Sequence, residues 1–185
     1  MRELSLHILD IAENSLRSGA SLIEIKINED SDKNLYQIII EDDGCGMSQC
    51  YQDRVLDPFV TERKTRNVGL GLPLFKQTSE MCSGELILKS DLNKGTIVEV
   101  NMKRNHIDMP PMGSITDTII SLILAEEECD ICFVHKVDDY EYTFSTKEIK
   151  EKIEDVDLND SQIINWIKSY LENNENNLRE KGALL

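Results

Sequence analysis

An acid and two glycines at the end of an apolar segment form the first group of residues that could do chemistry. Asp42, Gly44 and Gly46 directly follow Leu35–Glu41, whose composition is typical of a strand. Glycine allows a positive φ and a close approach to a bound group, and a carboxylate in an apolar pocket can accept hydrogen bonds from a ligand amine. An Asp-Gly pair is also a common turn signal. These residues alone therefore fit either a ligand site or a tight turn.

A second group lies near the amino terminus. Apolar side chains recur at helical spacing over residues 4–18, so Asp10 and Asn14, four residues apart, are expected one turn apart on one helix face. An acid and an amide at this spacing can share a hydrated cation, with the acid polarising a water. The same spacing fits an exposed polar stripe. His7, a turn earlier, is expected to be a structural histidine rather than a catalytic one.

A third group combines glycines with cations. Gly69-Leu-Gly-Leu-Pro73 leads into a helix expected over residues 74–82, and a helix amino terminus offers free amides and a positive dipole end to phosphate. Just before it, Arg63-Lys64-Thr65-Arg66 is the only tight basic cluster in the sequence. That cluster fits either a solvated loop or an anion site.

The elements that must position these groups alternate in a regular order. Residues 1–104 are expected to form a helix, two strands, a lid-like loop, a second helix and two more strands, with strands over 22–28, 35–41, 85–90 and 96–102. Each pair of strands is close enough in sequence to form a hairpin. The pattern predicts an α+β fold, a two-layer sandwich with helices on one face of a mixed, mainly antiparallel sheet.

The remaining residues are expected to form a separate unit. Met109-Pro-Pro-Met112 marks a linker over 105–112, and residues 113–185 are expected to form a small acidic α/β domain of unknown role. It would contain a helix over 115–125, a hairpin over 129–145 and two helices that begin near 145 and 160. An apolar face on the last helix, Ile163 to Leu171, fits either core packing or a docking surface.

Composition excludes some classes of partner. The formal net charge is −15, and most of the excess acid lies after residue 104, so no basic face for nucleic acid is expected. No membrane span or signal peptide is visible, which predicts a soluble cytoplasmic protein without a membrane partner. The five cysteines are expected to be free thiols. Cys129 and Cys132 form a CxxC, but no second pair is visible to complete a zinc site.

The order of the motifs resembles a known family. Asp10–Ala20 resembles an N box, Asp42–Met47 a first glycine box, Asp57–Thr61 an F box and Gly69–Leu72 a second glycine box, and Gly95-Thr96 follows near the last strand. Residues 1–104 are thereby similar to the GHKL superfamily of ATP-binding domains, which includes gyrase-type and mismatch-repair ATPases, heat-shock chaperones and histidine kinases. The resemblance implies a Bergerat-type fold that binds ATP and Mg²⁺.

The resemblance also implies a role for each motif residue. Asp42 would accept the adenine amino group, Thr96 and a water would share that edge, and Gly44 and Gly46 would let the backbone approach the ring. Asn14 would hold the magnesium ion. The other residues implied to contact the nucleotide are Gly69, Leu70 and Gly71 through main-chain amides, Arg63 or Lys64 from the lid, and Met47, Phe59, Thr61 and Leu72 within the motifs.

The fate of the γ-phosphate is left open by the sequence. Hydrolysing members of the superfamily carry a glutamate one helical turn before the magnesium asparagine, and Asp10 stands there in this chain as the candidate catalytic base. The short lid looks more like a histidine kinase, but no phosphoacceptor hairpin precedes the N box. The expected function is therefore a kinase acting in trans or a slow ATPase. The alternative is a non-catalytic, nucleotide-switched binding or regulatory module, with a protein partner bound through the acidic carboxyl-terminal part.

Overall fold

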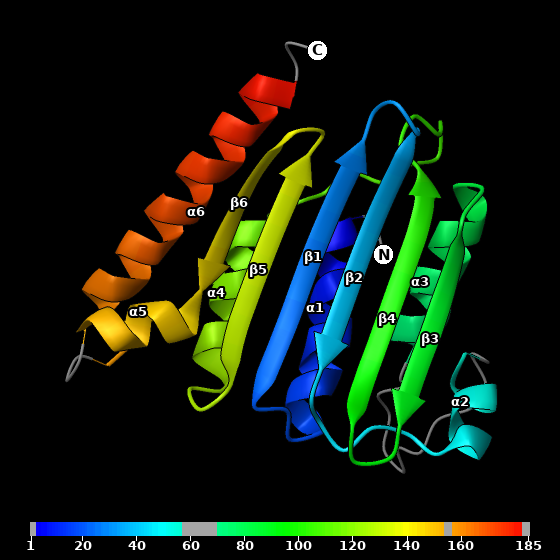
Figure 1. Ribbon diagram of the computed structural model, residues 1–185, viewed down its shortest axis with the longest axis horizontal. Coiled ribbons are helices and arrows are strands. Elements are labelled where there is room, and N and C mark those ends of the chain that lie inside the picture. The colour runs from blue at the N-terminus through cyan, green and yellow to red at the C-terminus, as the bar shows by residue number, and fades with distance from the viewer. Residues whose placement is uncertain (1–2, 57–69, 154–156, 183–185) are drawn as a thin grey trace.

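The computed structural model of the protein describes residues 3–56, 70–153 and 157–182, which form one six-stranded sheet with helices packed against it (Figure 1). The strands lie in the order β3-β4-β2-β1-β5-β6, and only β1 and β5 pair in parallel. This confirms the predicted mixed, mainly antiparallel sheet. The strands are β1 (Leu22–Asp30), β2 (Leu35–Asp42), β3 (Glu85–Asp91), β4 (Gly95–Lys103), β5 (Asp130–Val137) and β6 (Tyr140–Ser145).

The helices cover one face of the sheet. Figure 1 shows α1, α3 and α4 behind the strands. Alternation along β1 explains why: Ile23, Ile25 and Ile27 are buried, whereas Glu24 and Lys26 between them lie on the open face. The two-layer α+β fold is therefore confirmed. The helices are α1 (Leu4–Arg17), α2 (Gln49–Val55), α3 (Gly71–Met81), α4 (Ile115–Ala125), α5 (Thr146–Ile153) and α6 (Ser161–Gly182).

The carboxyl-terminal residues extend the same sheet. Strand β5 lies beside β1 with Leu22 opposite Asp130, so β1 is an inner strand. The segment expected to be a linker also contacts the first helix, because Pro111 and Met112 accept hydrogen bonds from the amides of Leu4 (3.0 Å) and Ser5 (2.8 Å). These bonds satisfy two of the free amides at the start of α1. The division into folding units at 1–104 and 113–185 stays a prediction.

Two local features differ from the expectation. Helix α2 lies where only a polar connection was expected, since its seven residues carry no clear apolar period. The helix expected over residues 74–82 ends at Met81, and the residue with the left-handed conformation that follows it is Ser83, at φ 56°, rather than Gly84. A side chain on Gly84 would instead meet the backbone oxygen of Asn101 at 1.8 Å. Close packing against β4 therefore explains this glycine.

A buried histidine links α6 to the sheet. His135 of β5 is 3% exposed, and its Nδ1 lies 2.7 Å from Oε1 of Glu175 on α6. Its Nε2 lies 3.4 Å from Oε1 of Glu29 on β1. Tyr142 of β6 donates to Glu175 at 2.6 Å, and Arg104 donates to Glu29 at 3.0 Å. Burial alone would lower the pKa of His135, but the two carboxylates outweigh it and raise the pKa to about 8.

The free energy of unfolding is expected to fall as the pH rises from 6.5 through 8. In the unfolded chain His135 has its ordinary pKa of 6.5, so the folded state holds the extra proton between these two values. The stabilisation is fully present below pH 6.5 and is lost above pH 8. It amounts to roughly 2 kcal/mol, at about 1.4 kcal/mol for each unit of pKa shift. Urea unfolding on either side of this window measures it.

The variants His135→Gln and His106→Gln separate this effect from others. H135Q is expected to be less stable at low pH and to show a flatter pH dependence across the window. H106Q changes a histidine outside the cluster and is expected to keep the wild-type slope. If the stability of H135Q fell with pH as steeply as that of the wild type, a group other than His135 would hold the extra proton of the folded state.

Candidate functional site

Three of the predicted motifs meet around one cavity on the helix-covered face. Helix α1 contributes its carboxyl-terminal half, strand β2 its last residue and helix α3 its first turn. Alternating apolar and small polar positions on α1 bring this half of the helix against the sheet. The residues that line the cavity are Ile11, Asn14, Ser15, Ser18, Asp42, Gly46, Met47, Leu72, Thr96 and Val98.

Asp42 is the buried acid of this cavity. It is 9% exposed, its Oδ2 accepts a hydrogen bond from the Ser15 hydroxyl at 2.6 Å, and its Oδ1 accepts one from the Gly44 amide at 3.0 Å. A carboxylate has about four acceptor positions, so these two bonds fix its orientation and leave acceptor capacity over. Asp42 can therefore receive an N–H from a ligand.

Thr96 lies directly opposite Asp42 in the β2–β4 pair. The Ser90 hydroxyl donates to the Gly95 carbonyl at 2.9 Å and accepts from the Met47 amide at 2.8 Å. Its hydrogen is thus in use, so Thr96 is the donor in the 2.9 Å contact between the two hydroxyls. The lone pairs of the Thr96 oxygen are left to accept from a ligand or a water.

Two glycines allow the turns around Asp42 to approach each other. Gly46 has φ +61°, and a side chain there would meet the Asp91 carbonyl oxygen at 2.0 Å. Gly44 is restricted by a side chain, since an added Cβ would lie 1.9 Å from Oγ of Ser18. The first glycine motif is therefore packed between α1 and the β3–β4 turn.

Asp10 lies against the first turn of α3. A Cβ on Gly71 would be 3.2 Å from both Cβ and Oδ2 of Asp10. The acid is half-buried and lies one turn before Asn14, as the spacing predicted. A helix amino terminus carries partial positive charge, which favours a carboxylate beside it. Gly71 and Leu72 are buried, and Leu70 before them is exposed.

Asn14 is exposed at the rim of the cavity. Its Oδ1 accepts a hydrogen bond from Nη1 of Arg17 at 3.3 Å, and Arg17 also pairs with Glu13 at 2.6 Å. The amide oxygen is thus directed toward a positive group. It is the type of hard oxygen ligand that magnesium accepts.

His7 packs inside the protein instead of facing the cavity. Its ring is fully buried and stacks on Phe75, with centroids 4.7 Å apart and an interplanar angle of 11°. Nε2 lies 3.2 Å from the Thr78 hydroxyl. Burial lowers the pKa of His7 to about 4, so the ring is neutral at neutral pH. These contacts agree with the structural role expected from the sequence.

Five predicted nucleotide contacts lie outside the described residues. They are Phe59 and Thr61 of the F box, Arg63 and Lys64 of the basic cluster, and Gly69 of the second glycine box. Their roles stay predictions. The structure does bring the remaining predicted residues of the N box and both glycine boxes to one end of the sheet.

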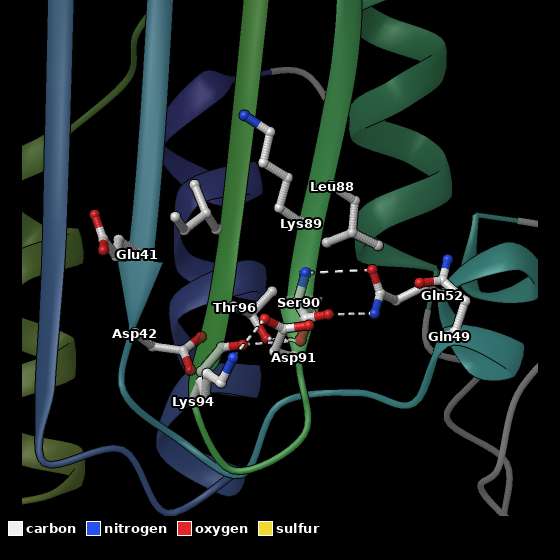
Figure 2. Close-up of a pocket in the computed structure, with 12 residues that line it drawn as sticks. Glu41, Asp42, Gln49, Gln52, Leu88, Lys89, Ser90, Asp91, Lys94 and Thr96 are labelled. Carbon is white, nitrogen blue, oxygen red and sulfur yellow. Dashed lines mark hydrogen bonds and ion pairs between the residues drawn. The ribbon is translucent and has the colours of Figure 1, made fainter.

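A larger cavity of about 440 Å³ lies at the same end of the sheet, beside α2 (Figure 2). Figure 2 shows Gln52 of α2 facing the β3 backbone, where its side chain accepts from the Ser90 amide at 3.2 Å and donates to the Ser90 carbonyl. Glu41 faces the open side of the sheet, because it alternates with Asp42 along β2. Asp42 and Thr96 line both cavities.

The sequence alone did not single out the serines that orient these groups. Ser15 is 3% exposed and continues the buried stripe of Ile8 and Ile11, so a polar residue at an apolar position was the available signal. Ser18 caps the carboxyl-terminal end of the same helix. Ser90 gave no such signal, because its role depends on how β3 pairs with β4.

The cysteines have no arrangement that suggests chemistry. Across residues 3–56, 70–153 and 157–182, no group of three or more His, Cys, Asp or Glu side chains could hold a metal ion. Burial raises the pKa of the Cys132 thiol and raises that of Cys129 to about 11, which keeps both protonated at neutral pH. Separately, none of the helices in the described part is long and apolar enough to cross a membrane.

Histidine kinases are among the proteins whose sequences are similar to this chain. The chain is 33% identical over 94 residues to the sensor histidine kinase CitA of Klebsiella pneumoniae, a match that covers 49% of this chain and 17% of the relative. It is 26% identical over 121 residues to the histidine protein kinase DivJ of Caulobacter vibrioides, covering 63% of this chain and 20% of the relative. The chain thus spans a fifth or less of the length of these relatives.

A solved structure shares the fold, and a family model matches more than half of the chain. The ATPase domain of Aquifex aeolicus MutL, complexed with ADP, shares the fold with a TM-score of 0.51 and 14% identity, covering 83% of this chain and 68% of that one. Residues 2–106 match the family described as histidine kinase-, DNA gyrase B- and HSP90-like ATPase. That match includes every element that contributes to the cavity around Asp42. The chain therefore belongs to the histidine kinase-, DNA gyrase B- and HSP90-like ATPase family, and the predicted superfamily is confirmed.

Proposed function

We propose that this protein binds Mg-ATP, with Asp42 as the residue that reads the adenine amino group. The observation that carries the proposal is the buried Asp42 carboxylate, which Ser15 and Gly44 hold in place beside the Thr96 hydroxyl. Both groups present acceptors to the same cavity. An exocyclic amine can donate to Asp42, and a water can join Thr96 to the same edge of the ring.

The phosphates would lie toward the first turn of α3. Its leading amides, at Leu70, Gly71 and Leu72, are backbone donors at the positive end of a helix. Asn14 would hold the magnesium ion through its side-chain oxygen, which accepts one hydrogen bond from Arg17 and keeps a second lone pair for the ion. The bound ion would neutralise part of the negative charge of the phosphates.

The proposed reaction is phosphoryl transfer to a partner in trans or slow hydrolysis. Asp10 is the candidate base, since it lies one turn before Asn14 and beside the start of α3. Its carboxylate would accept the proton of a water or of a partner group as the phosphoryl group is attacked. A protein partner would bind through the acidic carboxyl-terminal part, in the cytoplasm.

Incubation with γ-labelled ATP in a lysate of the source cells distinguishes the outcomes. Label on another protein supports a kinase acting in trans, whereas label released as free phosphate supports an ATPase. Intact ATP, with no labelled protein, supports the second candidate, a module in which nucleotide only switches binding.

Asp10→Asn is expected to keep nucleotide affinity and to slow phosphate release by roughly 100-fold or more, the usual contribution of a general base. Glu13→Gln is the matched control, because Glu13 is adjacent in sequence but pairs with Arg17 at the surface. Release should be close to wild type in E13Q. A colourimetric phosphate assay, with affinities from calorimetry, measures both effects. Unchanged release in D10N would show that Asp10 is not the base.

A further inference from the structure

A further pocket lies at the opposite end of the same helix-covered face. Its volume is about 440 Å³, within the range of roughly 300–1,000 Å³ that is usual for small-molecule sites. Tyr36 lines it near the start of β2, whereas Asp42 ends that strand. Six residues of extended chain, at about 3.3 Å each, place the two sites roughly 20 Å apart. In Figure 1 this is the upper end of the sheet.

The buried hydroxyl of Tyr36 indicates that a hydrogen-bond partner is missing. The side chain is 6% exposed, and its hydroxyl oxygen makes no hydrogen bond to any residue in the described part of the chain. A buried hydroxyl without a partner costs about 1–3 kcal/mol. Burial, Glu29 and Glu175 raise the pKa of Tyr36, while Arg179 and Arg104 act against them, so the hydroxyl stays protonated and can donate.

Two guanidinium groups line the same space. Arg104 uses its Nε for Glu29, and its terminal nitrogens have no partner among residues 3–56, 70–153 and 157–182. Arg179 of α6 is exposed at the rim and makes no ion pair with any described residue. With the protonated ring of His135 nearby, three cations face two acids, Glu29 and Glu175. Arg104 and His135 are already paired with these acids, whereas Arg179 makes no such pair with a described residue.

The other wall is apolar. Five apolar residues line it: Leu4 of α1 and the consecutive residues Met109, Pro110, Pro111 and Met112. The carbonyl oxygens of Pro111 and Met112 are bonded to the start of α1, so this wall is fixed in place. Such a surface suits a hydrocarbon body next to a charged group.

We propose that this cavity binds a small organic carboxylate, with the carboxyl group between Arg104, Arg179 and the Tyr36 hydroxyl and an apolar body against Met109 and Met112. A guanidinium can hold a carboxylate through two parallel hydrogen bonds. The ligand would also satisfy the Tyr36 hydroxyl. The site uses none of the residues assigned to nucleotide, so it is separate from the proposed function.

Titration with phenylacetate tests the proposal, with phenylacetamide as the uncharged analogue of the same shape. The methyl resonances of Met109 and Met112 report binding at the site by NMR. Phenylacetate is expected to give saturable shifts of both methyls, and phenylacetamide to bind roughly tenfold more weakly, since hydrogen bonds to a charged group are stronger than those to a neutral one. Equal binding of the two compounds, or no saturable shift, would overturn the proposal.

Variants test which side chains contact phenylacetate. Arg179→Gln and Tyr36→Phe are each expected to weaken phenylacetate roughly fivefold or more, since each removes a donor. Asp42→Asn is the control and should leave phenylacetate binding unchanged while it weakens ATP. Inorganic phosphate is a further probe: binding as tight as that of phenylacetate would contradict an organic ligand. Wild-type affinity in both R179Q and Y36F would also contradict the assigned contacts.

Discussion

Gly95→Ala is expected to lower the free energy of unfolding by at least about 3 kcal/mol and to abolish nucleotide binding. Gly95 has φ +100°, a conformation that side-chain-bearing residues rarely adopt. An added Cβ would lie 1.8 Å from the Asp42 carbonyl oxygen and 2.9 Å from Cα of Asp43. Both contacts are with backbone, so β2 and β4 must separate where Asp42 and Thr96 face each other. Urea unfolding and calorimetry with ATP measure the two losses.

Gly19→Ala is the matched control for this variant. Gly19 also has a positive φ, +74°, but an added Cβ there has no atom within 4 Å. The free energy of unfolding of G19A should fall only by the conformational strain, about 1–2 kcal/mol, and its ATP affinity should be unchanged. If G95A and G19A lost similar stability, the close approach of β2 and β4 at Gly95 would be unimportant.

Asp42→Asn is expected to weaken ATP binding by roughly 1 to 3 kcal/mol, or about 5- to 150-fold in dissociation constant. The change keeps the size of the side chain but replaces an acceptor oxygen by an NH₂ donor. The Ser15 hydroxyl can accept from the new NH₂, because its own hydrogen can turn to the Ile11 carbonyl, but the ligand amine then meets one neutral oxygen that also accepts from the Gly44 amide. Isothermal titration calorimetry with ATP measures the affinity.

Asp139→Asn removes the same charge at an exposed position in the β5–β6 turn and should bind ATP as the wild type does. Thermal melts of both variants show whether the fold is kept. An ATP dissociation constant in D42N equal to that of D139N would overturn the assignment of Asp42 as the adenine-reading residue.

Sequence periodicity was enough to predict most of the elements. The apolar stripe of residues 4–18 predicted α1, and alternation predicted the β1–β2 and β3–β4 hairpins, because side-chain burial in these elements follows local geometry. The order of motifs then indicated that Asp42, Thr96 and Asn14 belong to one site. The structure places all three around one cavity.

What the sequence could not predict depends on contacts between distant segments. The parallel pairing of β1 with β5 leaves no local pattern, since β1 alternates in the same way whether it lies at an edge or inside the sheet. The bond from Ser15 to Asp42 joins a helix to a strand end 27 positions away. Likewise, the sequence marks Tyr36 only as a strand residue. Arg104 and Arg179 line the same pocket but lie far from it in the sequence.

The inner position of β1 has a consequence during synthesis on the ribosome. Strand β1 emerges early, and β2 can pair with it at once, but its other edge has no partner until Asp130–Val137 have been made. An unpaired edge next to a row of buried isoleucines is a template for pairing with other chains. The nascent chain is therefore most prone to aggregation before β5 is complete. Slower translation after β4 would prolong that interval.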